Sequence, residues 1–277
     1  MQQNPREMQD ALQVSAAASE AKKDSEFHVL STNTNLEVRN PECSNDLQEG
    51  STVPLISREE LDRAFDERFP SWMKEKLADS RVAVAGLGGL GSNIAVSLAR
   101  SGVGHLLLVD FDVVDVTNLN RQMYLIPHLG MPKTQALRQI LTQINPYLDI
   151  QTRQLRVTAQ NAGALFKDWP IVCEAFDRAD QKAMLVGALL TQCPETTIVS
   201  GNGMAGLGDA NMIRTRQKLR RLYVCGDGET DSAQGAGLMA PRVAICAGHQ
   251  ANKVLQLITE TGNNIKQEIT SWKTNSF

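Results

Sequence analysis

The chain has 277 residues, of which 42% are hydrophobic and 21% are charged, the composition of an ordinary globular protein. Its formal net charge of -3 gives no basic field, which disfavours nucleic acid as the main partner. No apolar run approaches the roughly 20 residues of a membrane-spanning helix, and the polar N-terminus lacks the apolar core of a secretory signal. We therefore expect a cytoplasmic protein without membrane contact.

Residues 1–56 form a polar extension rich in Gln, Ser, Asn, Ala and Glu. Such a segment buries little apolar surface, so we predict a poorly ordered or degenerate N-terminal extension. Ser57 with Glu60 then has the capping-box pattern that starts a helix. Apolar residues recur beyond it at helical spacing, at Leu61, Phe65, Phe69 and Trp72. They predict an amphipathic N-terminal helical arm.

From Arg81 onward, short apolar runs alternate with amphipathic segments. Predicted strands cover 81–86, 104–110, 147–157, 171–175, 196–200, 212–215 and 220–225, and predicted helices cover 90–100, 133–145, 158–167, 178–193 and 243–260. This alternation predicts a Rossmann-like α/β fold, a mostly parallel sheet with helices on both faces. The last two strands predict an antiparallel pair. We assign 57–262 to this domain and 263–277 to a C-terminal tail.

Four glycines, Gly86, Gly88, Gly89 and Gly91, stand between the first predicted strand and the next helix. This context is typical of a nucleotide-binding loop, whose backbone N–H groups and helix dipole hold phosphate oxygens. Asp110 ends the second strand, where a carboxylate can bind ribose hydroxyls or instead cap loop amides. We interpret the following Asp112 as a solvated loop residue. A nicotinamide dehydrogenase fits these features equally well.

A polar block further along separates the two kinds of enzyme. A triphosphate needs positive charge around its phosphates, and Asn118, Arg121 and Lys133 supply an amide and two cations. Individually they read as a turn residue, a surface charge and the first turn of a helix. A cation at a helix N-terminus is unfavourable, however, unless an anion lies beside it. Together these residues favour an ATP-using enzyme.

Asp177 follows the predicted strand 171–175, at the edge of the sheet where α/β proteins bind ligands. A carboxylate that faces a triphosphate is best explained by Mg²⁺ between the two. Asp180 is an alternative, although it can instead cap the next helix. We predict that Asp177 binds the metal.

Six blocks resemble the superfamily of enzymes that activate ubiquitin-like proteins and sulfur carriers, and short ThiF-type proteins in particular. They are GLGGLGS at 86–92, VDFD at 109–112, NLNRQ at 118–122, GMPK at 130–133, INP at 144–146 and EAFD at 174–177. The resemblance implies that ATP adenylates the C-terminal glycine carboxylate of a ubiquitin-like sulfur carrier in thiamine biosynthesis, releasing pyrophosphate. It implies that Asp110 holds ribose, that Asn118, Arg121 and Lys133 hold phosphates, and that Asp177 binds Mg²⁺.

The family also uses an arginine of the N-terminal helix that reaches the ATP of a partner subunit. The resemblance thus implies a homodimer in which Arg63, or alternatively Arg68, has this role. Many relatives bind zinc through two Cys-x-x-Cys pairs, but the five cysteines here include no such pair, so we expect no zinc. Cys225 is interpreted as a buried strand residue, and His249 as a packed one. Sulfur is therefore expected from a separate donor protein.

Three other functions stay open. One is adenylation of another acceptor, a molybdopterin carrier or a tRNA-base carboxylate, and a second is an NAD-dependent dehydrogenase. The third is a dimeric scaffold without activity, which the intact phosphate-site positions disfavour. A basic cluster, Arg214, Arg216, Lys218, Arg220 and Arg221, is explained at least as well by a solvated face as by a binding patch.

Overall fold

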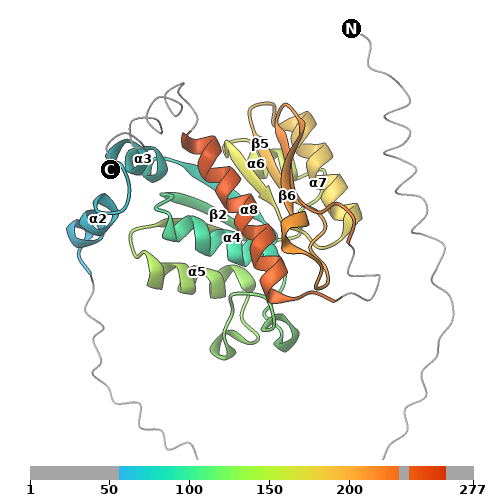
Figure 1. Ribbon diagram of the computed structural model, residues 1–277, viewed down its shortest axis with the longest axis horizontal. Coiled ribbons are helices and arrows are strands. Elements are labelled where there is room, and N and C mark those ends of the chain that lie inside the picture. The colour runs from blue at the N-terminus through green and yellow to red at the C-terminus, as the bar shows by residue number, and fades with distance from the viewer. Residues whose placement is uncertain (1–55, 231–236, 260–277) are drawn as a thin grey trace, which may run out of the picture. The chain divides into compact units, whose positions relative to one another are not determined.

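The protein's structure, a computed structural model, describes residues 56–230 and 237–259 (Figure 1). The predicted extension before residue 56 and the predicted tail 263–277 lie outside these residues. The described chain forms a seven-stranded sheet in the order β3-β2-β1-β4-β5-β7-β6. The strands are β1 (Arg81–Ala85), β2 (His105–Asp110), β3 (Asp149–Gln154), β4 (Ile171–Glu174), β5 (Thr197–Gly201), β6 (Arg214–Leu219) and β7 (Leu222–Gly226).

Helices cover both faces of the sheet, which follows from the alternation of side chains along each strand. On β1, Val82 and Val84 belong to one hydrophobic core, while Ala83 and Ala85 belong to the other. The first core packs against α4 (Gly89–Arg100), α5 (Lys133–Ile144) and α8 (Ala240–Thr259). The second packs against α6 (Ala162–Phe166) and α7 (Ala179–Gln192). Figure 1 shows α8 crossing the sheet beside α4.

The strand order creates a topological switch point at one edge of the sheet. β1 pairs in parallel with β2 on one side and with β4 on the other, so the chain reverses its direction of travel across the sheet at β1. Ligands of open α/β sheets bind at such a switch point, outside the carboxyl ends of the strands. β6 pairs antiparallel with β7 at the outer edge. The predicted Rossmann-like fold with an antiparallel pair is confirmed.

The N-terminal arm forms two helices, α2 (Arg58–Asp66) and α3 (Ser71–Ala78). The predicted capping box is confirmed, because the Glu60 N–H donates to Ser57 Oγ at 3.1 Å and the Ser57 N–H donates to Glu60 Oε2 at 2.9 Å. Pro70 separates the two helices, because a proline in a helix interior would remove a hydrogen bond and clash with the preceding turn.

The predicted strand 212–215 was misplaced. Met212 lies in the 3-10 helix η3 (Ala210–Met212), and β6 continues to Leu219. All six residues of β6 are exposed, so the strand lacks the apolar pattern by which strands are recognised in a sequence. α8 begins at Ala240, three residues before its predicted start. None of the described helices has the length and apolarity of a membrane span.

Candidate nucleotide-binding site

The glycine turn between β1 and α4 has a backbone that only glycine fits. Gly86 has φ +89°, and a Cβ there would lie 2.9 Å from the carbonyl oxygen of Ala175. A Cβ on Gly91 would lie 1.8 Å from the carbonyl oxygen of Gly86. No side chain caps the N-terminus of α4 at Gly88. The first N–H groups of α4 are thus available to an anion at the carboxyl edge of the sheet.

Asp110 ends β2 and holds this turn in place. Its buried carboxylate accepts hydrogen bonds from the N–H groups of Leu87, at 2.6 Å, and Asp112, at 2.9 Å. The structure therefore contains the loop-capping contact that the sequence left open. A carboxylate has about four acceptor positions, so these two bonds leave capacity for ribose hydroxyls, and that role stays a prediction.

Lys133 is the first residue of α5, and it is buried next to Asp112. Its Nζ lies 3.0 Å from Asp112 Oδ2, and its N–H donates to the Asp112 carbonyl oxygen at 3.0 Å. Asp112 thus supplies the anion that a cation at a helix N-terminus needs. The interpretation of Asp112 as a merely solvated residue was wrong, because the sequence does not show that the loop folds back onto α5.

Arg121 and Asn118 lie on the loop that follows β2. The aliphatic part of Arg121 packs near Gly89, since a Cβ on that glycine would lie 3.5 Å from Arg121 Cγ. Its Nη1 donates to the Thr117 carbonyl oxygen at 3.1 Å and to Asn120 Oδ1 at 2.7 Å. Asn118 Oδ1 accepts from the Asp115 N–H at 3.1 Å. Arg121 therefore adjoins the glycine turn, whereas Asn118 shapes its own loop.

Asp177 lies on the loop after β4, and its side chain makes no hydrogen bond or ion pair with the described residues. This loop adjoins the glycine turn, because a Cβ on Gly86 would touch Ala175 and Phe176. Asp180 is engaged differently. Arg178 donates to both of its carboxylate oxygens, at 3.1 and 2.8 Å, and these bonds lower the pKa of Asp180. The Asp177 carboxylate thus keeps its oxygens available to a cation, and its role as a Mg²⁺ ligand stays a prediction.

A buried ionic cluster lies under the same loop, and its role was missed in the sequence. Glu174 is fully buried at the end of β4. Its oxygens accept from Ser200 Oγ at 2.6 Å, from the Phe176 N–H at 2.8 Å and from Lys182 Nζ at 3.2 Å. Lys182 also donates to the Gly201 carbonyl oxygen at 2.8 Å. The cluster links the carboxyl ends of β4 and β5. Its residues are distant in the sequence, so no local sequence pattern predicts that they meet.

Gln122 is a second residue that sequence reasoning did not single out. It is buried beside the glycine turn, and a Cβ on Gly88 would lie 3.9 Å from its Nε2. Its Oε1 has no hydrogen-bond partner among the described residues. A buried polar atom without a partner costs free energy. An orphaned amide at this position fits a site that receives a polar ligand. The only signal in the sequence for this role was that Gln122 directly follows Arg121.

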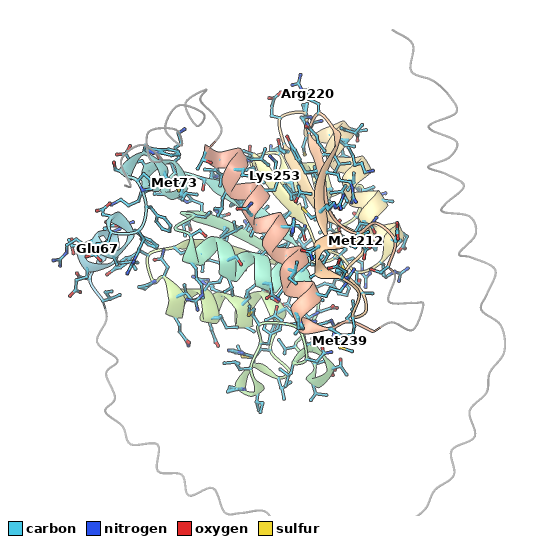
Figure 2. All side chains as sticks on the ribbon, viewed as in Figure 1. Glu67, Met73, Met212, Arg220, Met239 and Lys253 are labelled. Atoms are coloured by element: carbon cyan, nitrogen blue, oxygen red, sulfur yellow. The ribbon has the colours of Figure 1, made fainter. Side chains whose placement is uncertain are left out.

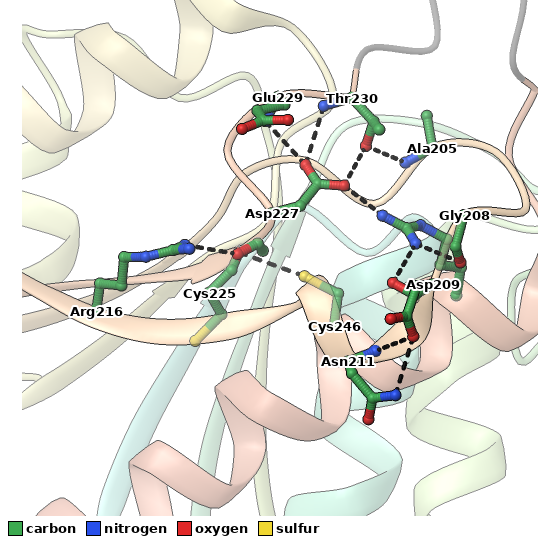
Figure 3. Close-up of polar contacts among 12 residues, drawn as sticks. Ala205, Gly208, Asp209, Asn211, Arg216, Cys225, Asp227, Glu229, Thr230 and Cys246 are labelled. Atoms are coloured by element: carbon green, nitrogen blue, oxygen red, sulfur yellow. Dashed lines mark hydrogen bonds and ion pairs between the residues drawn. The ribbon is translucent and has the colours of Figure 1, made fainter.

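Arg242, on the first turn of α8, links two loops at the carboxyl edge of the sheet. Figure 3 shows the residues of these loops, among them Gly208, Asp209 and Asp227. Arg242 donates to the carbonyl oxygens of Gly208 and Asp209 and forms a buried ion pair with Asp227. Burial raises the pKa of Asp227, but hydrogen bonds from Thr230 and Glu229 outweigh it, and the net pKa is lowered. The loops after β5 and β7 are therefore fixed against the N-terminus of α8.

The described cysteines are buried. Burial raises the pKa of Cys225 despite a contact with the Thr215 hydroxyl at 3.4 Å. His249 Nδ1 lies 3.1 Å from the same hydroxyl, so it packs against β6. In the described part of the chain, no three His, Cys, Asp or Glu side chains are grouped to hold a metal ion. A protonated, buried thiol is a poor nucleophile.

The two candidate arginines of the arm lie far from this edge. Arg63 and Arg68 are exposed, on α2 and just after it. The helix packs at the amino end of the sheet, where Phe65 approaches Gly102, shortly before β2. A cavity of about 280 Å³ there, between α2 and the starts of β2 and β3, is at the edge opposite the glycine turn. Neither arginine lies at the glycine turn of its own subunit.

The ThiF family model matches residues 61–277. This chain belongs to the ThiF family. The family match confirms the superfamily that the six sequence blocks predicted.

Relatives of this ThiF family member include two kinds of adenylyltransferase. The molybdopterin-synthase adenylyltransferase of Salmonella typhimurium is 31% identical over 196 residues, 68% of this chain and 77% of that protein. The adenylyltransferase and sulfurtransferase UBA4 of Eremothecium gossypii is 28% identical over 190 residues, 66% of this chain, which spans only 42% of that longer protein.

Among solved structures, the ATP complex of the tRNA N6-threonylcarbamoyladenosine dehydratase of E. coli superposes with a TM-score of 0.67. The two are 23% identical, and the match covers 74% of this chain and 97% of that one. At this identity the likeness supports the ThiF-type fold alone.

Proposed function

We propose that the chain is an ATP-dependent adenylyltransferase that activates the C-terminal glycine carboxylate of a ubiquitin-like sulfur-carrier protein. The observation that supports this proposal is that the uncapped glycine turn adjoins Arg121 and the loop that carries Asp177, while Asp110 and Asp112 link the turn to Lys133. A hydride-transfer enzyme needs the turn but not the two cations and the carboxylate. Adenylation needs all of them.

In the proposed reaction the carrier's carboxylate oxygen attacks the α-phosphorus of ATP. The bond from this phosphorus to the bridging oxygen breaks, pyrophosphate leaves with the electron pair, and an acyl-adenylate remains. No protein nucleophile is required, so the side chains position the reactants and neutralise charge. Arg121 and Lys133 contribute positive charge to the phosphates, and Asp110 orients the ribose. Asp177 would hold Mg²⁺, which neutralises the charge of the phosphate oxygens.

For the acceptor, we propose the sulfur carrier of thiamine biosynthesis, because the blocks around the glycine turn resemble short ThiF-type proteins. The molybdopterin carrier is the second candidate, because relatives at about 31% identity are molybdopterin-synthase adenylyltransferases. We further propose a cytoplasmic homodimer in which Arg63 serves the partner's ATP. Sulfur then comes from a separate donor protein, because the described cysteines are buried and protonated.

The central test is ATP–pyrophosphate exchange with each candidate carrier. Asp177→Ala is expected to lower the exchange rate about 100-fold, the usual effect of removing one electrostatic contact to a reacting group. Asp180→Ala is the matched control, since this neighbouring carboxylate is engaged by Arg178. Equal losses in the two variants, or exchange with none of the carriers, would refute the mechanism. Tight NAD binding without exchange would instead identify a dehydrogenase.

The partner arginine is tested by mixing two inactive chains. In a mixed dimer of Arg63→Ala and Lys133→Ala chains, one site combines an intact Lys133 with an intact Arg63 of the partner. Exchange should therefore return to a quarter of the wild-type rate, because about half of randomly mixed dimers are mixed and each has one site. Arg68→Ala chains mixed in the same way show whether the other arginine acts. Absence of recovery in both mixtures contradicts an arginine supplied by the partner.

A further inference from the structure

The hairpin of β6 and β7 carries a concentration of positive charge that the proposed chemistry does not use. Between residues 210 and 226 the chain has five basic residues and no Asp or Glu, although its net charge is -3. The turn of the hairpin projects from the body of the protein, with Arg220 at its tip (Figure 2). We call Arg214, Arg216, Lys218 and Arg220 the basic hairpin face.

Two of the five basic side chains form hydrogen bonds that stabilise the fold. Arg221 donates to the carbonyl oxygens of Leu190, Cys193 and Thr196 and so closes the end of α7. Arg216 donates to the Gly226 carbonyl oxygen at 3.0 Å. The side chains of Arg214, Lys218 and Arg220 make no hydrogen bond or ion pair with any described residue.

The basic hairpin face lies on the open side of the outermost strand. Thr215, between the two arginines, contacts His249 of α8, so Arg214 and Arg216 point to the opposite face of the sheet. All of β6 is exposed there, and no strand pairs with its outer edge in the described sheet. Lys218 lies at a break in the pairing register, just before the turn.

This face begins at the edge of the sheet that carries the candidate site. Arg214 pairs with Gly226, and Cys225 pairs with Gly201, where β5 also ends beside the Lys182 cluster. β6 then runs away from that edge, and Arg214 to Lys218 spans roughly 13 Å at the rise of a strand. A protein whose tail enters at the carboxyl edge has its folded body within reach of β6.

We propose that the basic hairpin face is the docking surface for an acidic face of the carrier protein; this inference rests on the proposed adenylation. Charge complementarity selects the partner, because three unpaired cations on an otherwise acidic protein attract an acidic surface. RNA fits less well. The segment 212–221 contains no aromatic residue for stacking on bases, and an isolated stripe of charge is not an extended basic field.

The test is a triple variant, Arg214→Gln, Lys218→Gln and Arg220→Gln, which spares the structural Arg216 and Arg221. The matched control is Arg100→Gln, Arg138→Gln and Lys167→Gln, which removes three exposed charges elsewhere. Binding of the thiamine and molybdopterin carriers is measured by calorimetry at 50 and 300 mM salt, beside ATP binding and the exchange rate at saturating carrier. The hairpin variant is expected to raise the carrier Kd about tenfold at low salt and to flatten the salt dependence of this Kd, because three exposed charge pairs are lost. The control and ATP binding stay unchanged.

An unchanged carrier Kd in the hairpin variant overturns the docking surface but leaves adenylation intact, provided that exchange persists. Aggregation of that variant with an unchanged Kd would assign the charges to protection of an exposed strand edge. Tighter binding of wild type to transfer RNA than to either carrier, lost in the variant, would also overturn the proposal. Absence of carrier-dependent exchange in the wild type refutes the proposed adenylation itself. This result differs from the outcomes above, in which exchange persists and only the docking surface is refuted.

Discussion

Replacing Lys182 by methionine tests whether the ionic cluster under the Asp177 loop stabilises the protein. The substitution keeps most of the side-chain volume and removes the ammonium that lies 3.2 Å from both carboxylate oxygens of Glu174. The carboxylate is fully buried, whereas the lysine side chain is 18% exposed. Removing one partner of a buried pair costs about 3–5 kcal/mol. The remaining bonds from Ser200 and Phe176 place the expected loss at the lower end, about 3 kcal/mol.

Urea and thermal unfolding followed by circular dichroism measure this loss. At 2–4 °C per kcal/mol for a chain of this size, the melting temperature is expected to fall by roughly 6–12 °C. The double variant Glu174→Gln with Lys182→Met removes both charges, so it is expected to be more stable than Lys182→Met alone. Lys167→Met, on an exposed site, controls for the substitution itself. A loss below about 1 kcal/mol, or a double variant as unstable as the single one, refutes the reasoning.

The other predictions concern the glycine turn, the buried Asp227 carboxylate and the cysteine thiols. Gly91→Ala is expected to abolish ATP binding in calorimetry, because its Cβ would overlap the Gly86 carbonyl oxygen; binding at wild-type affinity contradicts this. The pKa of Asp227 is lowered in the folded state, so its contribution is present above an unfolded pKa of about 3.9 and is lost as pH falls below that value. Asp227→Asn should therefore reduce the acid-dependent loss of stability below about pH 4. An unchanged pH profile in unfolding experiments would contradict this. In a Cys43→Ser chain, iodoacetamide is expected to label the remaining cysteines only after the protein unfolds. The reason is that burial raises the pKa of Cys225 and raises the pKa of Cys246 to about 12, which keeps these thiols protonated. Rapid labelling of the folded protein, measured by mass spectrometry, would contradict this.

The glycine turn was predictable because its information is local. Gly86 and Gly91 lie five residues apart, and the close approach of their backbones restricts both positions to glycine. The position of Lys133 at the start of α5 was predictable for the same reason, since the amphipathic spacing that follows Lys133 predicts the helix. The fold class followed from the alternation of strands and helices.

Other features depend on contacts between distant segments. Glu174, Lys182 and Ser200 come from β4, α7 and β5, and only the parallel register of the two strands brings them together. The prediction of β6 was misplaced because this exposed edge strand lacks the alternating apolar residues that mark a half-buried strand. The sequence identified Asp177 and Asp180 as candidates but did not show that Arg178 engages one of them.

The ion pair between Lys133 and Asp112 has a consequence for how tightly an anion binds. Before any ligand arrives, the charge of Lys133 is already neutralised from within the chain. An anion that binds Lys133 Nζ therefore replaces one partner with another, and the net gain from this residue is only the difference between the two. Single phosphate or sulfate ions gain little from such an exchange. A ligand that also contacts Arg121 and the amides of α4 would gain more, so at the proposed site the ion pair is expected to favour polyphosphates over single anions.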